Sequence, residues 1–389
     1  MISPTQSRKY ASPAASDRLV FLSTMFTADD QRHMARALQL AAQGLYTTTP
    51  NPRVGCVIVR DGTVVGEGWH AKAGEPHAEP LALAAAGDRA AGATLYVTLE
   101  PCAHHGRTPP CVDALLAAKP ARVVAAMQDP NPKTAGKGFE QLRAAGIRVD
   151  SGLMEQEAIE LNVGFVSRMT RGTPWVRMKV AASLDGRTAL ADGQSQWITG
   201  AEARRDGHAW RARACAVLTG VGTVKDDDPQ LNVRDVETSR QPLRVVVDSR
   251  MQTPLTAKIL GPGAIIAAAG ADVPRMVALR AKGAEVVVLP NHEGKVELPA
   301  LLQELARRGC NEVHVEAGHK LNGSLIDEGL VDELLIYMAP SILGDTAQGM
   351  FHLPPLKSLA ERRNVKITEV TQVGADLRIL ARLNPEGAS

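Results

Sequence analysis

The sequence predicts an α/β protein made of two three-layer domains. Strand-length apolar runs alternate with segments of helical spacing along most of the chain, which is typical of sheets covered by helices. The 389 residues suffice for about two domains. The alternation breaks and restarts near Arg171-Gly172-Thr173-Pro174. We therefore expect a disordered tail over residues 1–24, a first domain over 25–171 and a second domain over 172–389.

The tail has two further interpretations. It contains several Ser residues together with Arg8, Lys9 and Arg18, but it lacks the apolar segment of a secretory signal. A transit peptide has a similar composition, and Met25 could be the true start of the chain.

The first domain should begin with a helix and then alternate strands with helices. Thr27 and Asp30 form a near capping box at the start of a helix that ends before Gly44. Asp61-Gly62 joins two apolar runs in the manner of a tight hairpin. Strands and helices should follow in this order: hairpin strands 54–59 and 63–69, helix 78–86, strand 93–99, helix 112–118, strand 122–127, a loop over 129–138, then a helix, a strand and a helix over 155–165.

The second domain repeats the alternation with more strands. Gly374 separates two closing runs, 365–373 and 376–383, which should form an antiparallel pair at a sheet edge. The other expected elements are a helix over 201–213 and strands over 175–182, 216–220, 243–248, 264–268, 285–289, 312–316 and 333–338, with helices between several of them.

Composition excludes several classes of partner. The 44 Lys and Arg residues against 42 Asp and Glu give a net charge of +2, and 5 Phe, 4 Trp and 4 Tyr offer few surfaces for stacking bases, so we expect no nucleic acid partner. No apolar run reaches the roughly 18 residues of a membrane span. Five cysteines scattered through the chain fit a reducing cytoplasm better than a disulfide framework.

The strongest chemical signal is a set of zinc ligands. His77-Ala78-Glu79 is followed by Pro101-Cys102 and then by Cys111. One imidazole and two thiolates leave the fourth position of a tetrahedral zinc open for water, which is typical of a catalytic site. Glu79 is then free to move protons between that water and a leaving amine. The pattern is that of zinc deaminases of nucleobases, although the two cysteines here lie farther apart than in the short form.

Other interpretations of these residues stay open. His77 could be a helix cap, with Cys102 and Cys111 as small core residues. His104 and His105 could compete for the metal, although their loop is more suited to contacting substrate. Cys56, Cys215 and Cys310 should be buried apolar residues rather than ligands.

The stretch Thr98-Leu99-Glu100-Pro101-Cys102-Ala103-His104-His105-Gly106-Arg107-Thr108-Pro109-Pro110-Cys111 resembles the bifunctional riboflavin-biosynthesis deaminase/reductase family. Residues 50–56 and 129–138 agree with that family, and the likeness runs from about Thr27 to the C-terminus. The resemblance implies a cytidine-deaminase-like first domain that uses Zn²⁺. This domain would deaminate 2,5-diamino-6-(5-phosphoribosylamino)pyrimidin-4-one. It also implies a second domain, similar to dihydrofolate reductase, that reduces the ribosyl group to ribityl with NADPH.

Residue by residue, the resemblance implies two sets of contacts in the second domain. The substrate would contact Ser195, Arg211, Leu231, Arg234 and Glu316. NADPH would contact Ala181, Trp197, Thr223, Asp227, Ser249, Gly318, His319, Lys320, Leu321, Asn322, Gly323 and Ser324.

Physical arguments bear on some of these residues. Arginine forks and hydroxyls suit a sugar phosphate, so Ser195, Arg211 and Arg234 are the candidates to hold it, although Arg211 could instead belong to a solvated helix face. Gly220-Val221-Gly222-Thr223 is an incomplete dinucleotide fingerprint, because position 225 is Lys. The turn from Gly318 into a helix offers better phosphate contacts, but His319-Lys320 stand where many relatives carry Pro-Thr. Arg250 is a candidate for the 2′-phosphate of NADPH.

We expect a cytoplasmic, homo-oligomeric enzyme, a dimer or a tetramer, that acts on a small phosphoribosyl pyrimidine. One rival is a tRNA or polynucleotide deaminase with an appended domain, which the near-neutral charge disfavours. Another is a zinc-stabilised binding module without catalysis, which Glu79 disfavours, because a structural zinc site has no use for a carboxylate outside its ligand set.

Overall fold

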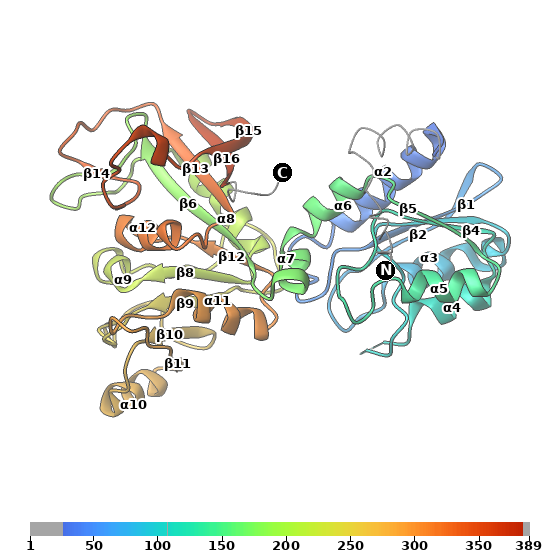
Figure 1. The fold of residues 1–389 in the computed structure, drawn as a ribbon, viewed down its shortest axis with the longest axis horizontal. Helices are drawn as coiled ribbons and strands as arrows, with labels where there is room; N and C mark the ends of the chain where they lie inside the picture. The colour runs from blue at the N-terminus through green and yellow to red at the C-terminus, as the bar shows by residue number, and fades with distance from the viewer. Residues whose placement is uncertain (1–25, 107, 384–389) are drawn as a thin grey trace, which may run out of the picture. The chain divides into compact units, whose positions relative to one another are not determined.

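The computed structural model describes residues 26–106 and 108–383, which form two compact units (Figure 1). Of the described residues, one unit comprises those up to Gly44 together with those of Arg53–Leu161, and the other comprises Leu45–Pro52 together with those from Asn162 to Leu383. The tail expected over residues 1–24 lies outside the described residues. Within the described ranges, no helix is both long and apolar enough to traverse a bilayer.

The first unit contains a five-stranded sheet in the order β2-β1-β3-β4-β5. β1 pairs antiparallel with both β2 and β3, whereas β3, β4 and β5 run parallel. The predicted hairpin is confirmed by the β1–β2 pair. The strands are β1 (Gly55–Arg60), β2 (Thr63–Trp69), β3 (Thr94–Val97), β4 (Arg122–Ala125) and β5 (Arg148–Ser151).

Helices cover both faces of this sheet, as the prediction of three layers requires. A Cβ on Gly55 of β1 would lie 2.0 Å from the Ala37 carbonyl oxygen of one helix, and a Cβ on Gly68 of β2 would lie 2.4 Å from the Ala78 carbonyl oxygen of another. Cys56, the neighbour of Gly55, pairs with Gly68, so these helices lie on opposite faces. The helices are α2 (Ala28–Ala42), α3 (Ala78–Ala86), η1 (Gly87–Ala90), α4 (Cys111–Ala118), α5 (Lys137–Ala144) and α6 (Glu155–Leu161).

Local signals explain where two of the helices begin. The capping box at α2 is confirmed: the Asp30 amide donates to Thr27 Oγ1 at 3.1 Å, and the Thr27 amide donates to the Asp30 carboxylate at 2.9 Å. Pro80 lies within the first turn of α3, where its missing N–H costs no helical hydrogen bond. His77 is the N-cap of that helix, so the sequence around Pro80 fixes where the histidine lies.

The second unit is built on a nine-stranded sheet in the order β11-β10-β9-β8-β12-β6-β13-β16-β15. The strands from β11 to β13 are parallel, and β16 and β15 close the sheet as the predicted antiparallel pair. The strands are β6 (Trp175–Ser183), β8 (Ala216–Gly220), β9 (Leu243–Val247), β10 (Ala264–Ala268), β11 (Ala284–Val288), β12 (Glu312–Val315), β13 (Glu333–Ala339), β15 (Val365–Val373) and β16 (Asp376–Leu383), and a separate two-stranded sheet pairs β7 (Arg187–Ala189) with β14 (Gln348–Gly349).

One predicted helix differs from the structure. The helix expected over residues 155–165 is two helices, because Asn162 leaves the helical conformation with φ −113° and ψ 21°. The second of them, α7 (Val163–Arg171), belongs to the second compact unit. The domain division expected at residue 172 stays a prediction. The other helices of the second unit are α8 (Ala201–Arg213), α9 (Val221–Asp227), α10 (Val273–Ala281), α11 (Leu298–Arg307), α12 (His319–Asp327) and η2 (Leu359–Glu361).

A layer of buried charge lies on the large sheet. Arg177 of β6 donates to Glu333 of β13 at 2.5 Å and to Glu312 of β12 at 3.1 Å. Side chains alternate across a strand, so His314 and, just past the strand end, Glu316 point to the same face as Glu312. The last charged group of this layer is the Glu316 carboxylate, which lies where the parallel strands end. Open α/β sheets bind their ligands at this end of the strands.

Candidate metal centre and ligand cavity

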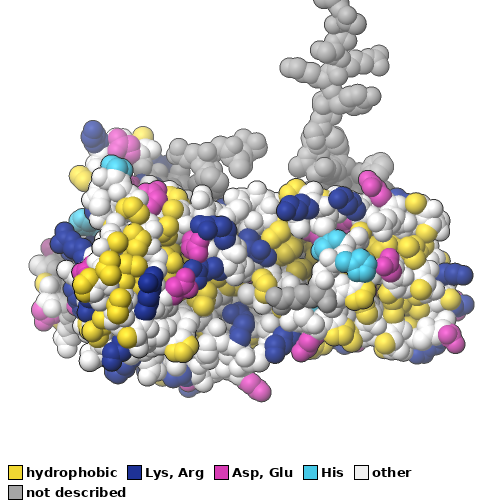
Figure 2. Space-filling view, turned by 90° about the horizontal axis from the view of Figure 1, so that it is seen from below, with side chains coloured by type: hydrophobic (Ala, Val, Ile, Leu, Met, Phe, Trp, Pro, Cys, Tyr) yellow, Lys and Arg dark blue, Asp and Glu magenta, His cyan; other side chains and the backbone are white. Residues whose placement is uncertain are grey.

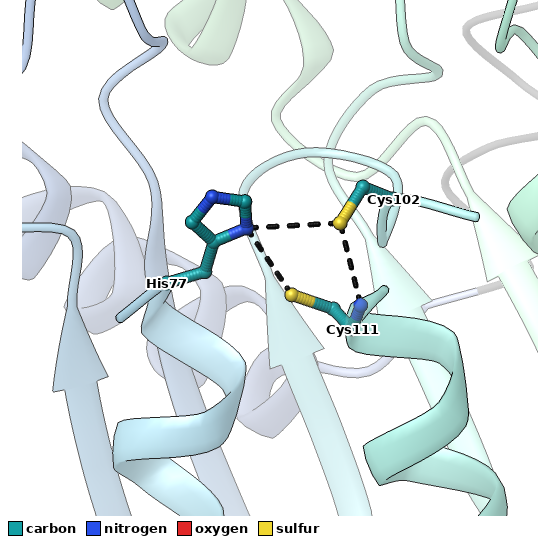
Figure 3. Close-up of side chains that lie close together, drawn as sticks. All are labelled: His77, Cys102 and Cys111. Atoms are coloured by element: carbon teal, nitrogen blue, oxygen red, sulfur yellow. Dashed lines mark hydrogen bonds between the residues drawn. The ribbon is translucent and has the colours of Figure 1, made fainter. Parts of the chain in front are cut away.

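The three predicted metal ligands meet in the first unit (Figure 3). His77 comes from the N-terminus of α3, Cys102 from the loop after β3, and Cys111 is the first residue of α4. Their ligand atoms all lie within 4.8 Å of one another, and across the described ranges no second group of three such side chains meets this criterion. His77 and Cys111 are 34 positions apart in the chain. They meet because the N-termini of α3 and α4 and the loop after β3 lie together.

The spacing of these atoms fits zinc. His77 Nδ1 lies 3.7 Å from Cys102 Sγ and 3.3 Å from Cys111 Sγ. A tetrahedral ion with ordinary Zn–N and Zn–S bonds would separate nitrogen and sulfur by about 3.5 Å. A hydrogen bond with the Cys111 thiol lowers the pKa of Cys102 to about 4, so the site favours one ligand in its thiolate form. Three protein ligands leave the fourth position open.

Two residues that the sequence interpretation missed orient these ligands. Thr108 Oγ1 lies 3.4 Å from His77 Nε2, so the hydroxyl can accept that N–H and leave Nδ1 for the metal. The buried His70 ring packs edge to face against His77, with 5.1 Å between ring centroids, and its own Nδ1 lies 3.1 Å from the Pro76 carbonyl oxygen. In the sequence, the only indication of a role for either residue is that Thr108 lies between the two cysteines.

Glu79 lies beside the ligands without belonging to their group. It occupies the first turn of α3 and is only 3% exposed. Burial, and after it the neighbouring Cys102, raises the pKa of Glu79 to about 7. A carboxyl group that titrates near neutral pH can both accept and return a proton, which is what general acid–base catalysis requires.

The other histidines and cysteines are placed differently. His104 and His105 are exposed and do not belong to the metal group. The prediction that Cys56, Cys215 and Cys310 are buried is confirmed, and all five cysteines are free thiols.

A cavity of about 570 Å³ opens in the second unit at the carboxyl ends of β6 and β12. It is lined by most of the residues that the sequence predicts for ligand binding. All five predicted substrate residues line it: Ser195, Arg211, Leu231, Arg234 and Glu316. Seven of the predicted NADPH residues line it too: Ala181, Trp197, Thr223, Asp227, Gly318, His319 and Asn322.

Features of this cavity fit a phosphate-bearing cofactor. Gly318 is the N-cap of α12, which has nine residues, so the first amides of that helix face the cavity. Asn322 is 2% exposed, and its Oδ1 has no hydrogen-bond partner within the part of the chain that is described. Arg204 lies over the ring of Trp197, 4.5 Å from its centroid, and Trp197 itself is 70% exposed at the cavity.

Some predicted contact residues lie elsewhere. Leu321 packs against the core and Gly220, a Cβ on Gly323 would lie 1.9 Å from the His352 carbonyl oxygen, and neither residue lines the cavity. Ser249 Oγ accepts the Val296 amide at 3.2 Å, and Arg250 is exposed. Contacts of NADPH with these residues, and with Lys320 and Ser324, stay predictions.

Arg211 and Glu316 form a two-pronged ion pair at the cavity wall. Arg211 Nη2 donates to one Glu316 oxygen at 2.9 Å, and Nε donates to the other. Arg211 is thus largely buried, with 17% of its side chain exposed, and is paired rather than part of a solvated face. Lys179, which the sequence interpretation did not select, lines the cavity with Nζ 4.0 Å from Glu316. Burial alone would raise the pKa of Glu316, but Arg211, His314 and Lys179 hold it well below its usual range.

Family comparisons agree with both sites. The family model described as "Cytidine and deoxycytidylate deaminase zinc-binding region" matches residues 27–127, which include the three ligands and Glu79. The model of the RibD C-terminal domain matches residues 174–379, which include the whole cavity. Together they define a zinc-dependent deaminase joined to a reductase.

Close relatives identify the family. The riboflavin biosynthesis protein RibD of Escherichia coli K12 is 50% identical over 361 residues, covering 90% of this chain and 98% of its own, and that of Haemophilus influenzae is 47% identical over 366 residues, covering 91% and 97%. A solved structure of Acinetobacter baumannii RibD is 46% identical with a TM-score of 0.85, covering 92% and 99%. The chain belongs to the RibD family.

It is therefore a bifunctional deaminase and reductase of riboflavin biosynthesis, and its two domains imply Zn²⁺ and NADPH. The predicted family, the two α/β domains and the two enzyme classes are confirmed. Neither the polynucleotide deaminase nor the non-catalytic zinc module is favoured.

Proposed function

We propose that the first domain deaminates 2,5-diamino-6-(5-phosphoribosylamino)pyrimidin-4-one and that the second then reduces its ribosyl group to ribityl with NADPH. A solved structure of a diaminohydroxyphosphoribosylaminopyrimidine deaminase/5-amino-6-(5-phosphoribosylamino)uracil reductase from Thermotoga maritima is 31% identical, with a TM-score of 0.79, and covers 92% of this chain and 99% of its own. The observation that carries the proposal is that one cavity gathers all five expected substrate residues with seven expected NADPH residues.

Deamination would depend on four residues. His77, Cys102 and Cys111 would hold zinc, which makes a water acidic enough to attack at neutral pH. Glu79 takes a proton from that water as a C–O bond forms at the ring carbon. The same carboxyl group then returns the proton to the amine, which leaves as ammonia when its C–N bond breaks.

Reduction would depend on the cavity of the second unit. Ser195 and Arg234 would hold the sugar phosphate at its outer side, and Glu316, with Lys179 and Arg211, would bind the sugar. NADPH supplies a hydride from C4 of its nicotinamide. With NADPH bound, its hydride would add to C1 of the opened sugar, where the C=N bond would become a C–N bond once the nitrogen takes up a proton.

Isotope labelling tests the proposed sequence of reactions. Single-turnover reactions with NADPH deuterated at C4, started from the diaminopyrimidine phosphoribosyl substrate, should place deuterium on C1 of the ribityl product. Mass spectrometry and NMR of the product read the position of the label. Deuterium found only in solvent would exclude direct transfer, and equal efficiency with NADH would exclude the preference for NADPH.

Arg234→Ala should raise KM for the phosphorylated substrate about 10-fold or more, since a hydrogen bond to a charged group contributes about 1.5–3 kcal/mol. The Arg234 guanidinium is exposed at the cavity, and among the described residues it donates to the neutral side chains of Gln230 and Asn232, at 3.1 and 2.8 Å, so its charge is available to a phosphate. Steady-state kinetics of the reductase should show a smaller change in kcat. Arg205→Ala, at an exposed position of α8 away from the cavity, is the matched control. Equal KM values in the two variants would contradict the role.

The proposal includes separable domains over residues 25–171 and 172–389. Each unit has its own sheet and core, which supports independent folding. The short segment Leu45–Pro52, however, packs in the second unit, where Arg240 Nε donates to the Tyr46 carbonyl oxygen at 2.8 Å and Asn311 donates to that of Pro50 at 3.2 Å. A reductase fragment should therefore be more stable when this segment is supplied.

We also propose a homo-oligomer, a dimer or a tetramer. The edge strand β15 exposes Val365, Ile367 and Val370, at 45, 58 and 57%, and α10 exposes Val273 and Val277. Figure 2 shows apolar side chains gathered on one face of the second unit. Apolar surface of this kind favours contact with another protein surface.

The proposed location is the cytoplasm, without a nucleic acid partner. Five free thiols suit a reducing compartment. A net charge of +2 offers little attraction to a polyanion.

A further inference from the structure

Two loops at the edge of the first sheet are joined by one buried carboxylate. The loop after β3 carries Glu100 and the metal ligand Cys102, and the loop after β4 spans residues 126–136 and leads into α5. The Glu100 amide donates to the Met127 carbonyl oxygen at 2.9 Å. The Glu100 residue is 4% exposed, so the link between the loops is shielded from water.

The carboxylate of Glu100 accepts four backbone hydrogen bonds from the second loop and helix. One oxygen accepts the amides of Asp129 and Gly136, both at 3.0 Å. The other accepts those of Gly138 at 2.8 Å and Phe139 at 3.4 Å. Glu100 therefore caps the N-terminus of α5 from another part of the chain, where a negative charge is favoured by the helix dipole.

The second loop is also held by its own side chains. The Asp129 carboxylate accepts the Asn131 amide at 2.9 Å and the Thr134 hydroxyl at 2.8 Å. The loop can thus act as a fixed support for the residues that contact it.

Gly138 lets the start of α5 lie directly against Pro101, the residue before the metal ligand Cys102. A Cβ at Gly138 would lie 2.1 Å from the Pro101 carbonyl oxygen, which is closer than any real contact. On its other side, the Cys102 carbonyl oxygen accepts the Val112 amide at 3.2 Å, and Cys102 Sγ accepts the Cys111 amide at 3.3 Å. The peptide carrying Cys102 is therefore held between α4 and the start of α5.

We propose that Glu100 and Gly138 are positioning residues that set the place of Cys102 in the zinc site and thereby the affinity for zinc. They act through Cys102 and do not belong to the group of metal ligands. When glutamine replaces Glu100, only one side-chain oxygen remains, so two of the four amides, which are buried or half-buried, lose their acceptor and the second loop can move away from Cys102. The inference rests on the zinc-dependent deamination and concerns how its metal is held.

The test is zinc affinity in the full chain, measured by competition with a chromophoric chelator. Glu100→Gln should weaken zinc binding about 10- to 100-fold, the usual cost of losing an outer-shell partner of a ligand. The d–d absorption of Co²⁺ in the same variant should change in shape, because the ligand geometry changes. Glu140→Gln removes the same charge at an exposed position of α5 and should leave both readings unchanged. Reductase activity of the same chain checks that the second unit is intact.

Gly138→Ala is a second variant that keeps the carboxylate, and it disturbs chiefly the close contact with the Pro101 carbonyl oxygen, because its Cβ would lie 2.1 Å from that oxygen and 3.2 Å from Glu100 Cγ and Oε1. This variant should also weaken zinc binding about 10- to 100-fold. If Glu100→Gln does not fold, Gly138→Ala alone tests the inference. Zinc affinity within twofold of the wild type in every folded variant, with an unchanged Co²⁺ spectrum, would overturn the inference. A wild-type chain that binds zinc without deaminating would instead contradict the proposed function.

Discussion

Glu79→Gln is expected to keep zinc and to lose deaminase activity by about two to four orders of magnitude, the usual contribution of a positioned acid–base group. Glutamine has nearly the shape of glutamate, so it can fill the same buried position in the first turn of α3. It cannot accept a proton from the attacking water, nor return one to the leaving amine. The metal should stay, because Glu79 does not belong to the group of three ligand side chains.

Elemental analysis and a deaminase assay on the same samples check this result. The wild type and Glu79→Gln should both contain about one zinc per chain, whereas Cys102→Ser should lose metal and deamination together. Glu75→Gln, a change of the same kind at an exposed position before α3, is the matched control. Full activity of Glu79→Gln would show that another group moves the proton.

The zinc site could be predicted because its ligands and Glu79 lie in short sequence motifs. His77 and Glu79 share one helix start, and Cys102 and Cys111 flank one loop, so four residues in the right order indicate the site before any fold is known. His70 and Glu100 could not be assigned in this way. His70 orients His77 by packing of its ring, and Glu100 acts on amides 29 to 39 positions away.

The order of elements along the chain was predictable for the same local reason. Turn residues and hydrophobic spacing indicate strands and helices one at a time, and the closing pair around Gly374 is an example. They do not indicate which strands are neighbours, so the order β8-β12-β6-β13, which brings Glu316 next to Lys179, was not predictable. The break at Asn162 and the packing of residues 45–52 in the second unit depend on tertiary contacts as well.

Glu316→Gln is expected to lower reductase kcat/KM by about 10- to 100-fold and to destabilise the second unit by about 3–5 kcal/mol, the cost of removing one partner from a buried ion pair. The amide leaves the Arg211 guanidinium and the Lys179 ammonium without their shared counter-charge at the cavity wall. The deaminase activity should stay unchanged, since the zinc ligands lie in the other unit.

The pH dependence of unfolding separates this charge effect from a packing defect. Arg211, His314 and Lys179 hold the pKa of Glu316 well below its usual range, against the effect of burial. The stability that the carboxylate contributes is therefore fully present above its unfolded pKa of about 4.3, and it is lost as the pH falls through the folded pKa. Denaturant unfolding should show a large deficit of Glu316→Gln against wild type at pH 7 that shrinks below about pH 4. Glu328→Gln, at an exposed position after α12, is the control and should lower the free energy of unfolding little at either pH. If the loss of stability in Glu316→Gln stayed constant with pH, the ion pair would contribute no net charge stabilisation.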